Sequence, residues 1–270
     1  MNTEMKFEHK SFGNRLKSMM KVDFRRMFTS KLFYIMIGVC LIVPILILVM
    51  TTMMDGTVSV DPQTGAETVV EGFDNAWQII GTVSGVESAG MSMDMTSMCN
   101  INLLYFAVAV LICLFVSEDF KSGYAKNLFT VRAKRGEYVA SKMILFLICG
   151  AVMMLAFFAG AMLGSAFAGL PFTMDGFTAG NLILCVIAKI ALIAVFAPIF
   201  LAGSVFAKQK TWLGIVVSCA VGMLLFMMIP MMTPLNATIM HAGMCLAGGV
   251  LFSIGLGAAS TRLLKKRDLV

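Results

Sequence analysis

Residues 117–142 read SEDFKSGYAKNLFTVRAKRGEYVASK and carry nine charged side chains. The runs on either side, at about 100–116 and 143–169, carry none. Each run is long enough to cross the apolar core of a bilayer as a helix, which takes roughly 17 to 25 residues. The quoted stretch is therefore expected to be a charged loop between two membrane spans, and the fold depends on where the other spans lie.

The composition indicates that the whole chain is membrane-embedded. Hydrophobic residues make up 59% of the sequence and charged residues 13%, and the mean hydropathy is +0.89. A water-soluble domain of 270 residues would need a polar shell that this chain lacks. The apolar runs predict six transmembrane helices, at about 32–54, 100–116, 143–169, 181–206, 212–228 and 237–259. The predicted fold class is an all-α membrane protein.

Lysine and arginine collect on one side of these predicted spans. Of 21 such residues, eight precede the first span, six lie between 121 and 142, two separate the fourth and fifth spans, and four follow the last. The opposite loops hold only acidic charges: Asp55, Asp61, Glu67, Glu71, Asp74, Glu87, Asp94 and Asp175. Because basic residues resist translocation, both termini and residues 117–142 are predicted to be cytoplasmic in a multi-pass protein of the cell membrane. The net charge of +6 then reflects topology and not binding to nucleic acid.

The charged loop contains an apolar pattern at helical spacing, made by Phe120, Tyr124, Leu128 and Val131. The pattern predicts one short amphipathic helix over 120–131, lying across the membrane surface. Gly123 is expected to permit close approach of another backbone, and Gly136 to interrupt the chain before it returns to the bilayer. A basic loop resting on anionic lipid headgroups is the alternative interpretation.

The segment before the first span has a second amphipathic pattern. Leu16, Met20, Phe24 and Met27 fall on one helical face, and basic residues cover the rest. This predicts a helix within residues 1–31 that lies in the plane of the inner membrane surface. A generic basic membrane anchor would have the same pattern.

Together these features resemble the permease subunits of ABC transporters of the ABC-2 type. The order of that family's cytoplasmic loop is followed by Glu118 and Asp119 at the end of the second span, then Gly123, the apolar face, Arg132 or Arg135, and finally Lys142. The resemblance extends to six spans, cytoplasmic termini and a long outer loop, as in type V exporters. It implies that the loop is a coupling helix that docks onto a separate ATPase subunit.

The resemblance also implies the partners. Since the chain has no GxxxxGK[ST] motif and no soluble segment that could hold a nucleotide domain, no cofactor is expected in it, and ATP and Mg²⁺ are expected on the ATPase. Two ATPase copies, a second permease copy or a homologous permease, and membrane lipid are the expected partners. The residues expected to dock against or anchor the ATPase contact are Glu118, Phe120, Tyr124, Leu128 and Arg132.

Small residues recur every four positions in two predicted spans. They are Ala156, Gly160, Gly164 and Ala168 in the third, and Gly249, Ser253 and Gly257 in the sixth. Such surfaces suit close helix packing, either within the chain or between subunits. Packing within the chain is the commoner use.

Lys189 lies within the fourth predicted span, where a charge is costly unless it faces protein or water. One interpretation is that Lys189 lines a substrate cavity. The other is that the span begins only at Ile190, so that the lysine marks the membrane interface.

The predicted outer loop, residues 55–99, has two further features. The stretch VSVDPQTGAETVV at 58–70 is typical of a β-hairpin and suggests a small packed extracellular element. Met91, Met93, Met95 and Met98 are weak candidates for a copper(I) site, because clustered thioethers bind that ion. Methionine is abundant in this chain as adaptable packing, so such clusters also arise without a metal.

The sequence therefore predicts the permease subunit of an ATP-driven exporter of an amphipathic peptide, drug or lipid, like the small bacterial permeases that export antimicrobial peptides. Its expected parts are a connecting helix at 1–31, a transmembrane domain at 32–259, an outer loop at 55–99, a coupling loop at 117–142 and a basic cytoplasmic tail at 260–270. No catalytic residue is expected. The alternatives are a non-transporting sensor or assembly module that docks a soluble protein, and a copper-related ABC permease.

Overall fold

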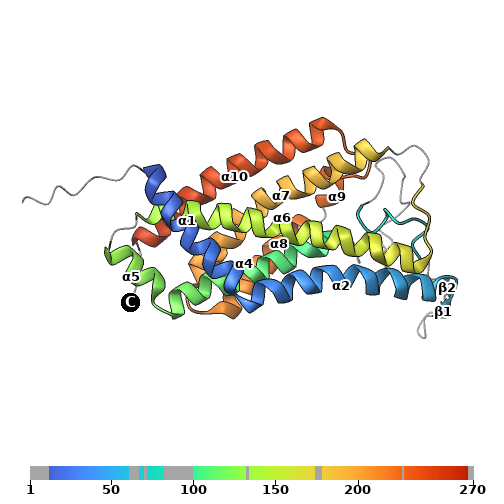
Figure 1. The fold of residues 1–270 in the computed structure, drawn as a ribbon, viewed down its shortest axis with the longest axis horizontal. Helices are drawn as coiled ribbons and strands as arrows, with labels where there is room; N and C mark the ends of the chain where they lie inside the picture. The colour runs from blue at the N-terminus through green and yellow to red at the C-terminus, as the bar shows by residue number, and fades with distance from the viewer. Residues whose placement is uncertain are drawn as a thin grey trace, which may run out of the picture.

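The computed structural model describes residues 12–60, 67–69, 72–81, 100–131, 134–173, 178–226 and 228–266. Its long helices run side by side along one axis (Figure 1). The helices are α1 (Phe12–Thr29), α2 (Lys31–Met54), α4 (Leu104–Lys121), α5 (Tyr124–Val131), α6 (Arg135–Ala168), α7 (Ala179–Ala207), α8 (Thr211–Phe226), α9 (Ile229–Met232) and α10 (Ile239–Lys266). A 3₁₀ turn, η1 (Ile101–Leu103), precedes α4, and two strands, β1 (Val58–Val60) and β2 (Glu67–Val69), follow α2.

Five helical segments in the described part of the chain are long and apolar enough to cross a membrane: α2, η1 with α4, α6, α7 and α10. The predicted all-α membrane fold is thus confirmed. Helix α8 is also apolar but has 16 residues, which is about 24 Å at the helical rise. Since a bilayer core is about 30 Å thick, the six-span count stays a prediction, and α8 is the span on which it depends.

Three helices extend beyond the apolar runs that predicted them. Helix α4 continues to Lys121 and α6 begins at Arg135, and the last described turns of the predicted tail belong to α10, which runs to Lys266. The expected break at Gly136 is therefore wrong, because that glycine is the second residue of α6. Hydropathy detects the membrane-embedded part of a helix, whereas the backbone hydrogen bonds continue into the polar region.

Both stripes of small residues pack inside the chain. Helix α2 lies along α6, where a Cβ at Gly164 would meet the Ile45 Cα at 2.8 Å. Helix α10 lies along α7, where a Cβ at Gly249 would meet the Ala194 Cβ at 2.7 Å. These glycines are needed because they let the helix backbones approach closely.

The bundle has two different ends (Figure 1). The charged end is formed by α1, α5, the first turns of α6 and the last turns of α10. The ribbon end is formed by the strands β1 and β2, residues 72–81, η1 and α9. The strands pair antiparallel, with Val58 opposite Val69, as the hairpin pattern predicts.

Residues 72–81 form a packed element at the ribbon end. Ile79 and Ile80 are fully buried. The Trp77 indole N–H donates to the carbonyl of Phe172 at 2.8 Å, and the Ile101 N–H donates to the carbonyl of Ile79 at 2.9 Å. This element therefore fastens the end of α6 to the start of α4.

Candidate functional site

The connection between α4 and α5 is a glycine turn. Helix α4 ends at Lys121, and Gly123 has a φ of +72°, a left-handed conformation that glycine adopts without steric cost. The prediction of one helix over 120–131 is therefore wrong, because the turn separates Phe120 from α5. The expected close approach at Gly123 is also wrong, since a Cβ there would meet no atom within 4 Å. Its role is conformational.

This turn decides where the predicted coupling residues lie. Phe120 is buried on α4, and Leu128 is half-buried on α5 and packs against the core. Tyr124 is also half-buried, and its ring lies 4.0 Å from the guanidinium carbon of Arg26. The three side chains thus face the chain itself, whereas Glu118 is exposed. Arg132 lies outside the described residues.

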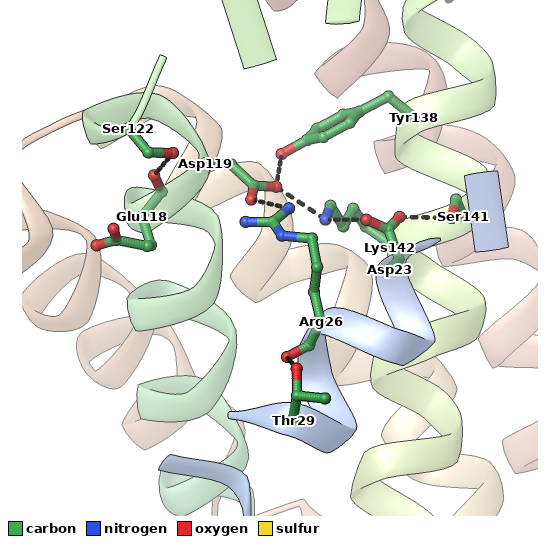
Figure 2. Close-up of polar contacts among 9 residues, drawn as sticks. All are labelled: Asp23, Arg26, Thr29, Glu118, Asp119, Ser122, Tyr138, Ser141 and Lys142. Atoms are coloured by element: carbon green, nitrogen blue, oxygen red, sulfur yellow. Dashed lines mark hydrogen bonds and ion pairs between the residues drawn. The ribbon is translucent and has the colours of Figure 1, made fainter. Parts of the chain in front are cut away.

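Next to this turn lies a buried network of charged groups from α1, α4 and α6 (Figure 2). Its centre is Asp119, in the last turn of α4, whose side chain has no exposed surface. One carboxylate oxygen lies 2.7 Å from a guanidinium nitrogen of Arg26, and the other lies 2.8 Å from the Lys142 ammonium. The Tyr138 hydroxyl donates to that second oxygen at 2.9 Å.

A second buried carboxylate, Asp23 of α1, completes the network (Figure 2). It accepts hydrogen bonds from the Lys142 ammonium at 2.8 Å and from the Ser141 hydroxyl at 2.7 Å. The Lys142 ammonium thus bridges Asp23 and Asp119. With Arg26, the network contains two anions and two cations.

Such pairing is what makes these buried charges tolerable, because desolvation of an unpaired ion costs several kcal/mol. Burial on its own would lower the pKa of Arg26, but the nearby Asp119, together with Tyr124 and Asp23, outweighs that effect and the pKa is raised. Burial, with Asp23 nearby, raises the pKa of Tyr124. The Lys142 ammonium also lies 4.4 Å from the ring centre of Phe115, a cation–π distance.

The network fastens the surface helix α1 to two spans. Asp23 and Arg26 on α1 hold α6 and α4 respectively, and Arg15 adds an ion pair to Glu137 of α6 at 2.9 Å. Tyr124 brings α5 under the same guanidinium. Displacement of α5 would therefore act on all three helices. Both carboxylates of the network, Asp23 and Asp119, lie against a cation.

The sequence pattern missed Asp23 as a buried group. It placed Leu16, Met20, Phe24 and Met27 on one helical face. The structure buries Met27 but not the other three, and it buries Met19 and Asp23 instead. The burial of Asp23 could have been predicted from its spacing, because Met19, Asp23 and Met27 are four residues apart and therefore share one helical face. Asp119 and Lys142 were identified only as positions that resemble the family's loop, and the ion pair between them was not predicted.

Lys189 lies at the other end of the bundle, eleven residues into α7, and its side chain has no exposed surface. Its ammonium donates to the Asn102 amide oxygen at 3.1 Å and to the Thr233 hydroxyl at 3.0 Å. Among the described residues no carboxylate forms an ion pair with it. Lys189 therefore joins η1, α7 and the turn after α9, and its role in a substrate cavity stays a prediction.

The candidate copper ligands Met91, Met93, Met95 and Met98 lie outside the described residues. Among those that are described, no group of three or more histidine, cysteine, aspartate or glutamate side chains could hold a metal ion. The six cysteines in that part of the chain are free thiols, and all but Cys219 are buried.

A comparison with protein families adds a finding to this geometry. The family model described as "ABC-2 family transporter protein" matches residues 20–225, more than half of the chain. The match includes all members of the buried network and helix α5. Comparisons with curated proteins and with solved structures return no match. The chain therefore belongs to the ABC-2 transporter family and is a membrane-embedded permease subunit of an ABC transporter, a type of protein that works with an ABC ATPase.

Proposed function

We propose that this permease exports an amphipathic peptide, drug or lipid, and that α5 is the coupling helix through which a separate ATPase drives it. Under this proposal the charged end is cytoplasmic, in agreement with the position of the basic residues. Two ATPase copies and a second permease complete the assembly. ATP and Mg²⁺ belong to the ATPase.

The observation that carries the proposal is the connection from α5 to the buried network. Helix α5 has eight residues and three exposed polar side chains, Lys126, Asn127 and Thr130. Its inner side is held by Tyr124 beneath Arg26 and by Leu128 in the core. A force applied to the polar face would thus pass directly to Asp119 and the spans.

Under this proposal, the residues that contact the ATPase differ from those that hold α5 against the rest of the permease. We assign docking to the exposed residues Glu118, Lys126 and Thr130, and anchoring to the inward-facing Phe120 and Leu128. A groove of complementary charge and polarity is then expected on the ATPase. Arg132, which follows α5 directly, stays in the docking set.

The coupling step follows from the cost of breaking the network. Removing one partner from a buried ion pair costs about 3–5 kcal/mol, so the ends of α1, α4 and α6 are expected to move together. When ATP closes the ATPase dimer, α5 would be displaced, and this group would tilt the attached spans. The tilt would open a path outward for the substrate.

The test is recovery of the partner from the native membrane. The full chain is purified in mild detergent and its copurifying proteins are identified by mass spectrometry. A variant with Lys126→Glu and Thr130→Glu, on the polar face of α5, is expected to lose the ATPase. Both sites are exposed, so the fold should persist, unlike after truncation of the buried Phe120.

A matched control changes Gln209→Glu and Lys210→Glu, two exposed residues in the turn between α7 and α8. This turn lies beside α4, since the Ser117 hydroxyl donates to the Lys208 carbonyl at 3.4 Å. The control is expected to keep the ATPase. Absence of any nucleotide-hydrolysing partner from the native chain would contradict the proposal and favour a sensor or assembly module.

A further inference from the structure

A cavity of about 420 Å³ opens at the charged end, apart from the buried network. It lies where the start of α1, α5, the first turn of α6 and the last turns of α10 meet. A volume of this size suits a small ligand or a headgroup. The coupling proposal does not use this space.

The cavity has an excess of positive charge. Of the residues that the structure describes, Lys134, Arg135 and Lys265 line it, together with a single carboxylate, Glu137. That carboxylate is already paired with Arg15 at 2.9 Å, so it does not neutralise the three cations. The cavity therefore favours an anion.

Two further features, one of a side chain and one of the backbone, strengthen the preference of the cavity for an anion. The Arg135 Nε is buried and has no hydrogen-bond partner within the described part of the chain. Helix α6 begins at Arg135, and the Glu137 and Tyr138 N–H groups donate to the Lys134 carbonyl at 2.9 and 3.4 Å. The first two N–H groups of the helix, those of Arg135 and Gly136, carry partial positive charge and have no acceptor within the helix. An oxyanion such as a phosphate would supply acceptors to both.

The walls and position of the cavity indicate the source of that phosphate. Two aromatic side chains, Phe12 and Phe129, line it beside the cations, and Phe12 is 55% exposed. Helix α10 presents large apolar side chains outward as far as Ile254 and an exposed basic one at Arg262. The boundary between membrane and water thus falls just before the cavity, at the level of lipid headgroups.

We propose that this cavity binds the phosphate group of an anionic phospholipid. Lys134, Arg135 and Lys265 would contact the phosphate, and Phe12 and Phe129 would contact the glycerol region. The bound lipid would join α1 to α10 across the base of α6. The proposal is independent of which substrate the permease exports.

The test is native mass spectrometry of the purified full chain, titrated with phosphatidylglycerol, phosphatidylcholine or inorganic phosphate. The native chain is expected to bind one phosphatidylglycerol saturably and phosphatidylcholine more weakly. The variant with Lys134→Gln, Arg135→Gln and Lys265→Gln is expected to bind phosphatidylglycerol at least about tenfold more weakly, since charge-assisted hydrogen bonds are lost.

A second variant places an apolar side chain in the cavity and keeps every charge. A Cβ at Gly136 would have its nearest neighbour, Thr261, at 3.9 Å, so Gly136→Leu can place its side chain in the cavity without displacing the backbone. It is expected to lose phosphatidylglycerol as the triple variant does. Unchanged binding would overturn the proposal, because it would show that the lipid does not enter the cavity.

A matched control removes three exposed charges from α1 through Lys17→Gln, Lys21→Gln and Arg25→Gln. Its affinity for phosphatidylglycerol is expected to change less than about twofold, since these groups do not line the cavity. An equal loss of affinity in the control would show that the lipid is attracted by the overall positive charge of this end and not by the cavity, and would overturn the proposal. Displacement of the lipid by inorganic phosphate would assign the site to the free anion and overturn the lipid source.

Discussion

The two ends of the bundle each bury one lysine completely, but they compensate its charge in different ways. At the charged end, Lys142 contacts two carboxylates and the face of an aromatic ring. At the ribbon end, Lys189 contacts only the neutral oxygens of Asn102 and Thr233 among the described residues. The first arrangement is an ionic joint between helices, and the second is a polar contact within the packed ribbon end.

The largest effect is expected from breaking the ionic joint. Lys142→Met would leave two buried carboxylates close together, with Arg26 as the remaining cation, at a cost of about 3–5 kcal/mol in the free energy of unfolding. Thermal unfolding of the purified chain in detergent should show a large fall in the midpoint. Adding Asp23→Asn should recover part of the loss, because it removes one of the two anions. A midpoint equal to that of the native chain would show that the network is not a stabilising joint.

The corresponding change at the ribbon end should cost less. Lys189→Met removes an ammonium without leaving a charged partner, and Thr233 still donates to the carbonyl of Ile229 at 2.9 Å. The unsatisfied Asn102 oxygen should cost about 1–3 kcal/mol. If the permease exports its substrate as proposed, transport by the reconstituted protein should persist, and its loss at unchanged stability would restore Lys189 as a substrate contact. A destabilisation as large as that of Lys142→Met would indicate an ionic partner for Lys189.

A change in the turn between α4 and α5 should lower the free energy of unfolding by less than either lysine substitution does. Gly123→Ala places a side chain in open space but forces alanine into the left-handed region, at a cost of about 1–2 kcal/mol. The expected result is a modest fall in thermal midpoint and weaker stimulation of the ATPase by the permease. Gly243→Ala, at a helical glycine with no neighbour within 4 Å, is the control and should not destabilise. Equal effects of the two changes would remove any special role for the turn.

The sequence correctly predicted five membrane-spanning helices but described the charged end poorly, for a physical reason. Hydropathy measures burial in lipid, which each span shows independently of its neighbours. The burial of Asp23 depends on α6, which lies more than a hundred residues away and supplies both Ser141 and Lys142. Before that partner is known, a lone aspartate among basic residues is typical of a solvated face.

The coupling segment shows the same limit at short range. The spacing of Phe120, Tyr124 and Leu128 is compatible with one helix, and a single glycine with positive φ between them was enough to divide it. Family resemblance pointed to residues 117–142 as the candidate coupling loop. It did not distinguish residues that face a partner from residues that face the chain, because that distinction depends on how α5 folds back under α1.

The smallest effect on stability, at the point where α5 meets the network, tests coupling most directly. Tyr124→Leu removes the ring beneath Arg26, a cation–π contact worth about 0.5–1 kcal/mol at a partly exposed site. Tyr124→Phe keeps the ring and should behave as the native chain. If α5 transmits force through Arg26 to Asp119, the leucine variant should retain the ATPase in copurification but stimulate its hydrolysis less than the phenylalanine variant does. Equal stimulation of ATP hydrolysis by both variants would show that force passes from α5 by another route, through the backbone of the turn at Gly123 or through Leu128. The buried network would then stabilise the fold without taking part in coupling.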